Sequence, residues 1–172
     1  MTSAFLKFAD LSLAFAKLLT ILIMVGMLIS VLLGVFFRFV IPLPMAWPPE
    51  AARFLMVAVT MIGASVALRQ LDHVGITLLV DILPIRVRGS LYLLGNVMIA
   101  VFLLIFIWFS WRLTADMGPR QTSSSLGLNM TFAYASMPIG GLMMLIQLIA
   151  VSIEGWRRMK KNESPFNQPL AL

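Results

Sequence analysis

The sequence contains no cysteine and few charged residues. Lys, Arg, Asp and Glu together make up 12% of the 172 residues, whereas a soluble globular domain carries roughly 25%. So few charges cannot cover a soluble surface, and the composition indicates an integral membrane protein long enough for about four spans. The lack of cysteine excludes disulfides, thiolate nucleophiles and Cys-ligated zinc or iron–sulfur sites.

The long apolar segments also lack ionisable side chains in their interior. A proton-coupled carrier or pump needs such a group inside the membrane, and a haem-b anchor would carry pairs of histidines on its helices. This chain has one histidine, His73, in an expected loop. The polar residues Asn96 and Gln147 lie inside spans, where we interpret them as interhelical hydrogen-bonding groups.

Hydrophobic residues make up 60% of the chain and fall into four segments bounded by charges. This pattern predicts an all-α integral membrane protein with spans at about 18–37, 50–70, 91–111 and 131–153. The first segment has 20 residues, which as a helix cover about 30 Å, the thickness of the hydrocarbon core. Residues 1–161 are therefore expected to form a single four-helix membrane domain.

The segments outside the spans have a different character. Residues 3–17 place Phe5, Phe8 and Phe15 on one helical face and charged side chains on another, which predicts an interfacial amphipathic helix leading into the first span. A cleaved signal peptide is not expected, because the A-x-A-like sequence at 14–16 precedes the long apolar run instead of following it. Residues 162–172 are expected to form a flexible tail.

The basic residues are divided unequally between the two sides of the expected membrane domain. Four spans place both termini and the 69–90 loop on one side, which then holds 9 of the 13 basic residues. Because Lys and Arg are retained in the cytoplasm, both termini and this loop are expected to be cytoplasmic. Residues 38–53 and 112–130 are expected to face outward, and Arg112, Asp116 and Arg120 offer weaker docking candidates there.

Small residues recur at four-residue spacing on three of the expected helices. They are Gly26, Ser30 and Gly34 on the first, Gly63 and Ala67 on the second, and Ser136 and Gly140 on the fourth. Small residues at this spacing let helix backbones approach closely. They predict close packing either among these helices or against another protein, and the sequence does not distinguish the two.

A series of residues between positions 34 and 84 carries a family pattern. In chain order it comprises Arg38, Trp47, Glu50, Arg53, Gly63, Ala64, Arg69, His73, Ile76, Asp81 and Pro84. The order resembles the small membrane subunit (the Q, or DctQ-type, subunit) of tripartite ATP-independent periplasmic (TRAP) transporters. Phe39 and the Pro48-Pro49 pair depart from that pattern, and neither departure removes a charged contact.

The resemblance implies a non-catalytic subunit in the bacterial inner membrane that enlarges the scaffold of a large, DctM-type membrane subunit. The large subunit would bind sodium and substrate, so no cofactor is expected on this chain. A periplasmic binding protein would deliver an organic acid, either a sialic acid, which we favour, or a C4-dicarboxylate. Membrane lipids are expected partners and nucleic acid is not. The alternatives are a self-contained small transporter and a membrane anchor or assembly protein without a transport role.

Candidate contacts with the partner subunits follow from the small-residue spacing and from the family pattern. They are Gly26, Ser30, Gly34, Arg38, Trp47, Glu50, Arg53, Gly63, Arg69, Asp72, His73 and Asp81. Glu50 and Arg53 lie three residues apart, so they can also pair on one helix face.

The cluster of Asp72, His73 and Asp81 has too few ligands for a metal site by itself. We interpret it as a polar turn whose acids pair with Arg69, Arg86 or Arg88 or cap the next helix. A partner contact and an ion or proton site remain as alternatives.

Overall fold

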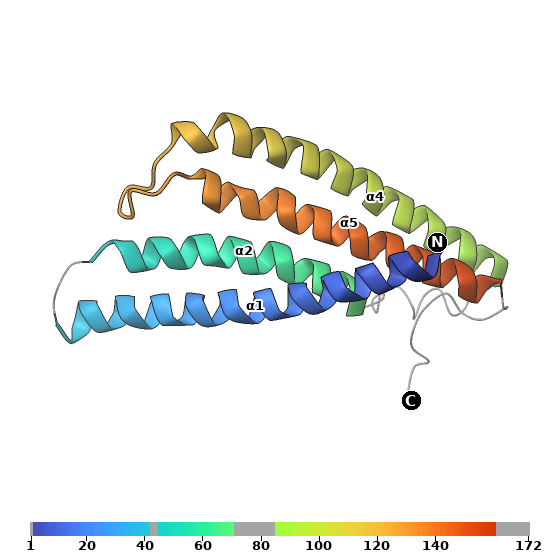
Figure 1. The fold of residues 1–172 in the computed structure, drawn as a ribbon, viewed down its shortest axis with the longest axis horizontal. Helices are drawn as coiled ribbons and strands as arrows, with labels where there is room; N and C mark the ends of the chain where they lie inside the picture. The colour runs from blue at the N-terminus through green and yellow to red at the C-terminus, as the bar shows by residue number, and fades with distance from the viewer. Residues whose placement is uncertain (1, 42–44, 71–84, 161–172) are drawn as a thin grey trace.

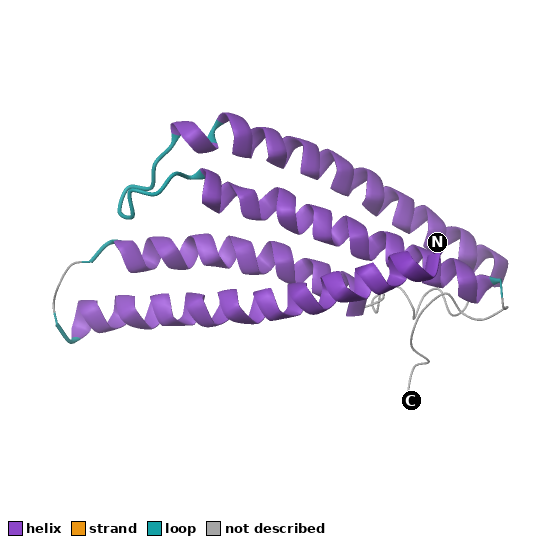
Figure 2. Ribbon diagram, viewed as in Figure 1, coloured by secondary structure: helices purple, strands orange, loops and turns teal. Residues whose placement is uncertain are grey.

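The computed structural model describes residues 2–41, 45–70 and 85–160. Within these ranges, four long helices make up the protein: α1 (Thr2–Phe39), α2 (Trp47–Gln70), α4 (Ile85–Asp116) and α5 (Thr131–Met159) (Figures 1 and 2). A short 3-10 helix, η1 (Gly118–Arg120), lies between α4 and α5. Over the same ranges, β-structure is limited to an isolated bridge between Thr122 and Asn129. The Asp72-His73 pair, Asp81 and the expected tail lie outside the described residues.

All four helices are long and apolar enough to cross a membrane, which confirms the predicted all-α membrane fold. The expected interfacial helix at residues 3–17 is not a separate element, since it continues into the first span as part of α1. No glycine or proline interrupts the sequence before Gly26, so nothing there favours a break in the helix. With 38 residues, α1 is about 57 Å long.

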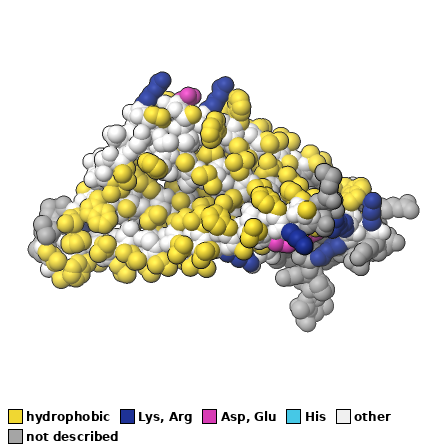
Figure 3. All heavy atoms as spheres, viewed as in Figure 1, with side chains coloured by type: hydrophobic (Ala, Val, Ile, Leu, Met, Phe, Trp, Pro, Cys, Tyr) yellow, Lys and Arg dark blue, Asp and Glu magenta, His cyan; other side chains and the backbone are white. Residues whose placement is uncertain are grey.

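The helices lie side by side in the order α1, α2, α5, α4, with neighbours in this row packed along their lengths (Figure 1). The last helix in the sequence, α5, thus lies between α2 and α4. The N-terminal part of α1 crosses the end of α2 and reaches α5 as well. An open row leaves most side chains of the outer helices α1 and α4 facing outward, and apolar side chains cover much of the face seen in Figure 3.

Glycines on α5 bring this helix close to both of its neighbours. A Cβ atom on Gly140 would lie 2.7 Å from the Cβ atom of Met61 on α2 and 2.8 Å from its carbonyl carbon. A Cβ atom on the adjacent Gly141 would lie 2.8 Å from the Cγ1 atom of Ile107 on α4. Two neighbouring glycines therefore seat α5 against both of its flanking helices. The four-residue spacing of small residues in the sequence indicated Gly140 but not Gly141.

The small residues of α1 pack against α2 of the same chain. Gly26 faces Leu55 and Gly34 faces Pro48, at 3.7 and 3.6 Å from the position of an added Cβ atom. Gly63 of α2 in turn faces Thr20, also at 3.6 Å. These distances are ordinary van der Waals contacts, so the α1–α2 seam is less tight than the two seams of α5.

Replacing Gly140 with alanine is expected to destabilise the protein by roughly 1–3 kcal/mol, because the new methyl group overlaps the backbone of Met61. Gly95→Ala on α4 is the matched control, since nothing lies within 4 Å of the added atom there. It should be neutral or stabilising by about 0.5–1 kcal/mol, the helix-propensity gain. Thermal unfolding of the detergent-purified variants measures both, and equal stability of the two variants would contradict the close α2–α5 contact.

Candidate subunit interface

The ionic contacts of the described helices lie at one end of the row, where α1 and α4 begin and α2 and α5 end. We call it the terminal end and the opposite end the loop end. At the terminal end, Arg69 of α2 donates through Nη2 to Asp10 of α1 at 3.0 Å and to Glu154 of α5 at 2.6 Å. The Arg69 side chain is only 10% exposed, whereas Asp10 and Glu154 are 62% and 33% exposed. This Arg69 junction joins three helices through one guanidinium group.

Neutral hydrogen bonds reinforce the same end of the row. The buried Gln147 of α5 donates through Nε2 to the carbonyl oxygen of Ala9 on α1, at 3.0 Å. Tyr92 of α4 donates its hydroxyl hydrogen to the carbonyl oxygen of Val151 on α5, at 2.9 Å, and its ring packs directly over Gly155. The bond from Gln147 confirms the interhelical role expected for that residue. Asn96, for which the same role was expected, is buried on α4.

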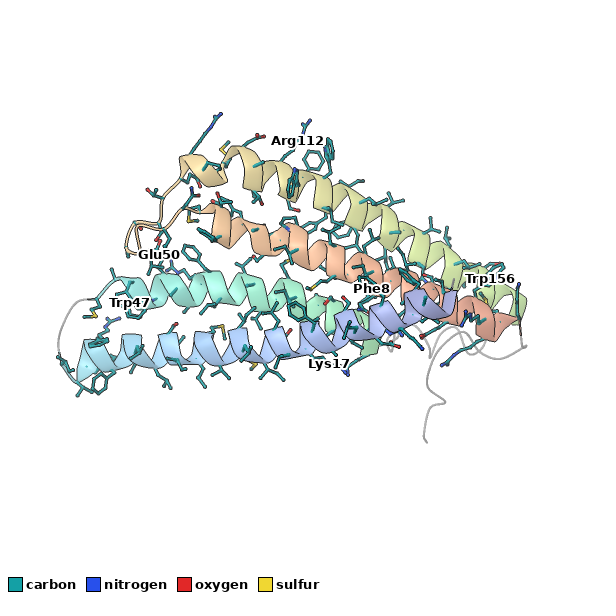
Figure 4. All side chains as sticks on the ribbon, viewed as in Figure 1. Phe8, Lys17, Trp47, Glu50, Arg112 and Trp156 are labelled. Atoms are coloured by element: carbon teal, nitrogen blue, oxygen red, sulfur yellow. The ribbon has the colours of Figure 1, made fainter. Side chains whose placement is uncertain are left out.

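At the loop end, Glu50 holds the α4–α5 connection against the start of α2. Its Oε2 atom accepts a hydrogen bond from the backbone N–H of Ser125 at 2.8 Å (Figure 4). The sequence suggested that Glu50 could pair with Arg53. Both residues are described, no ion pair joins them, and the Arg53 side chain is exposed. The Glu50 carboxylate is thus bonded to a loop amide, and the Arg53 side chain lies at the surface.

The connection between α4 and α5 is itself held by local hydrogen bonds. Asn129 accepts at Oδ1 from the backbone N–H of Thr131 at 2.9 Å and from its hydroxyl group at 2.6 Å, at the first residue of α5. Tyr134 donates its hydroxyl hydrogen to Gln121 Oε1 at 2.7 Å. Gly127 adopts a φ of 64°, a left-handed conformation that glycine tolerates without steric cost. The loop end therefore presents an ordered loop beside α2.

The candidate contact residues do not gather at one site. Gly26, Ser30, Gly34 and Gly63 lie at the α1–α2 seam. Arg38, Trp47, Glu50 and Arg53 lie at the loop end, and Arg69 lies at the terminal end. Asp72, His73 and Asp81 lie outside the described residues. The sequence suggested that Arg69 could pair with Asp72 or Asp81, which therefore stays a prediction. The partners of Arg69 among the described residues are Asp10 and Glu154.

A groove of about 750 Å³ between α1 and α2 at the loop end brings some of these candidates together. Its lining includes Ser30, Gly34 and Arg38 from α1 and Pro49 and Ala52 from α2. The lining is mostly apolar, and Arg38 is the only charged residue among the described residues that form it, so it offers a surface for an apolar partner rather than a charged substrate. In the part of the chain that is described, no three His, Cys, Asp or Glu side chains are placed to hold a metal.

These features define a multi-pass helical membrane protein in which Arg69, Asp10 and Glu154 join three helices. Residues 27–158 match the family described as tripartite ATP-independent periplasmic transporters, DctQ component. The chain belongs to this family, as the resemblance in the sequence predicted.

Two curated relatives have similar sequences. The chain is 29% identical over 124 residues to the sialic acid TRAP transporter permease protein SiaT of Haemophilus influenzae (strain 86-028NP), an alignment that covers 72% of this chain and 20% of SiaT. It is 25% identical over 131 residues to the sialic acid TRAP transporter small permease protein SiaQ of Vibrio cholerae serotype O1, covering 76% of this chain and 75% of SiaQ. The chain thus spans about a fifth of SiaT and three quarters of SiaQ.

We expect substitutions of Arg69, Glu154 and Asp10 to destabilise the protein to different extents. Arg69→Gln leaves two acids without their partner, so its destabilisation should exceed the roughly 1 kcal/mol of a surface pair and fall below the roughly 3–5 kcal/mol of a fully buried one. Glu154→Gln should cost more than Asp10→Asn, because its contact is shorter and less exposed.

Arg53→Gln is the matched control for Arg69→Gln, because Arg53 lies on the same helix and is exposed. Denaturant titration of each detergent-purified variant measures the free energy of unfolding. If Arg69→Gln proves as mild as Arg53→Gln, the junction does not hold the three helices together.

Proposed function

We propose that this chain is the non-catalytic small membrane subunit of a sodium-driven TRAP transporter, which scaffolds a large membrane subunit for uptake of a sialic acid. The observation that carries this proposal is that charged side chains lie at the ends of the spans and not within them. Between Lys17 and Arg38, Arg53 and Arg69, and Arg88 and Arg112, the helices carry no Asp, Glu, Lys, Arg or His. The nearly buried Arg69 is engaged with Asp10 and Glu154 of the same chain.

A carrier must compensate the desolvation of its substrate and ions with polar groups inside the membrane. The polar side chains of these spans instead bond to their own helix or to a neighbour, as Ser30, Ser110 and Gln147 do. This arrangement supports a static role, with sodium and substrate bound on the large subunit. It gives no reason to assign a cofactor or an enzymatic activity to this chain.

The open row supports the need for a larger membrane partner. α1 and α4 expose apolar side chains along most of their length, and small-residue contacts already occupy the seams between neighbouring helices. The alignment with SiaT covers only a fifth of a longer permease, which fits a small unit working beside a much larger one. A periplasmic binding protein is the third component in this proposal, and the loop end is where it would approach.

The substrate and the orientation rest on separate arguments. Both relatives are named for sialic acid, which favours that substrate over a C4-dicarboxylate. The 9-to-4 division of basic residues supports a bacterial inner-membrane protein with the terminal end in the cytoplasm and the loop end in the periplasm.

Cysteine labelling tests this orientation directly, because the chain has no cysteine of its own. Gln70→Cys and Ser124→Cys introduce single exposed thiols at the terminal end and the loop end, respectively. In intact cells with a permeable outer membrane, a membrane-impermeant maleimide should label only the Ser124→Cys variant. Lysed cells supply the control in which both react, and labelling of Gln70→Cys in intact cells would reverse the proposed orientation.

Reconstitution tests the scaffold role. The chain alone in proteoliposomes, with a sodium gradient and the sialic acid binding protein, should take up no labelled sialic acid, because its spans lack intramembrane ionisable groups. A large TRAP membrane subunit that co-purifies with the chain should restore uptake. Sodium-driven uptake by the chain without a partner would refute the scaffold role. If the assembled transporter took up C4-dicarboxylates but no sialic acid, the proposed substrate would be wrong.

A further inference from the structure

The groove between α1 and α2 at the loop end combines apolar walls with a single arginine. Val31 and Val35 line it from α1, and Pro49 and Ala52 line it from α2. Val31, Val35 and Arg38 follow each other at i, i+4 and i+7, so they share one face of α1. This stretch of α1 is about 10 Å long. Arg38 lies on the last turn of the helix, so the charge stands on the loop-end side of the lining.

The Arg38 guanidinium has no carboxylate partner among the described residues. Its Cζ atom lies 5.6 Å from the centroid of the adjacent Phe39 ring, a contact that orients the guanidinium but supplies no negative charge. The acid at the start of α2, Glu50, is bonded to the backbone N–H of Ser125 and is therefore directed toward the α4–α5 connection. The described lining thus includes a cation and no anion.

Arg38 lies at the level where lipid headgroups are expected. It ends the charge-free stretch of α1 that follows Lys17. The 20 residues between them cover about 30 Å, the thickness of the hydrocarbon core. Trp47 begins α2 at the same end of the row (Figure 4), and tryptophan favours the interface between headgroups and hydrocarbon. The valines of the groove therefore lie at acyl-chain depth, and the guanidinium lies at the headgroups.

We infer that this groove binds one anionic phospholipid, with its phosphate against Arg38 and an acyl chain between the valines of α1 and Ala52 of α2. The phosphate supplies the negative charge that the described lining lacks, and the acyl chain covers Val31 and Val35, which are exposed. The inference goes beyond the proposed function, and it depends neither on the transported substrate nor on the scaffold role.

Two protein occupants fit the groove less well. A second copy of the chain, related by a twofold axis along the membrane normal, would bring its own Arg38 to the same level, so that like charges would meet. A helix about 10 Å wide and two turns long displaces about 850 Å³, more than the groove volume of about 750 Å³, so a helix of the large membrane subunit would enter it only in part.

Native mass spectrometry of the full-length chain in detergent tests the inference, with phosphatidylglycerol and phosphatidylcholine as the two probes. The chain should retain phosphatidylglycerol in preference to phosphatidylcholine. A basic residue at an anionic lipid surface contributes enough for about a fivefold change in affinity. Arg38→Gln should therefore weaken phosphatidylglycerol binding about fivefold, whereas Arg38→Lys, which keeps the charge, should retain most of it.

Arg53→Gln is the matched control, because Arg53 is exposed at the same end of the row but does not line the groove. It removes the same charge from the chain and should leave binding unchanged. Ala52→Phe fills the α2 wall without altering charge and should also reduce binding. Val31→Phe does the same from the exposed wall of α1, and replaces Ala52→Phe if size-exclusion profiles show that the latter is misfolded.

Equal retention of the two lipids, or equal effects of Arg38→Gln and Arg53→Gln on phosphatidylglycerol binding, would overturn the inference. The groove would instead be a protein interface if Ala52→Phe abolished co-purification with the large membrane subunit while phosphatidylglycerol binding stayed intact. Failure of the reconstituted transporter to take up sialic acid, with lipid binding preserved, would contradict the proposed function alone, so the two failures are distinguishable.

Discussion

The contact on which the terminal end depends is the pairing of one guanidinium group with two carboxylates from different helices. Arg69 is nearly buried, and a charge in such a position is costly unless acids lie within reach. Asp10 and Glu154 supply them, and both lie outside the predicted spans at 18–37 and 131–153. The extensions of α1 and α5 beyond their spans therefore have a structural reason. They carry the acids to Arg69, and Gln147 and Ala9 fix the same crossing with a neutral bond.

In the middle of the membrane a different constraint determines the order of the helices. Lipid provides no hydrophobic drive for helices to associate, so packing depends on close approach of their backbones. Gly140 permits that approach toward α2, and Gly141 permits it toward α4. Because adjacent residues point about 100° apart on a helix, one glycine pair can serve two different neighbours. This placement puts α5 between α2 and α4 and leaves α4 at the edge of the row.

The sequence predicted the number and type of spans well, because hydropathy reports directly on transfer into the membrane. It did not predict that residues 3–17 and the first span form one continuous helix, α1. An amphipathic pattern does not indicate whether a helix bends at the membrane surface. The partners of Arg69 were also missed, because Asp10 and Glu154 lie 59 and 85 residues away. Local spacing instead suggested a Glu50–Arg53 pair, where the structure has a loop amide. The small-residue spacing indicated close packing, but it did not identify which helices would meet.

The crossing of α1 makes the two faces of the row unequal. At the terminal end, the N-terminal part of α1 lies over α5, so a partner approaching from that face meets the exposed side chain of Phe8 on α1 (Figure 4). Phe15, one heptad further along α1, is exposed as well. From the opposite face, the same partner meets α5 itself, with Ile149 and Trp156 exposed along a groove between α4 and α5. A partner on the first face would leave the groove open to the bilayer. In the proposed assembly, the large subunit therefore meets α1 on one face of the row and α5 on the other.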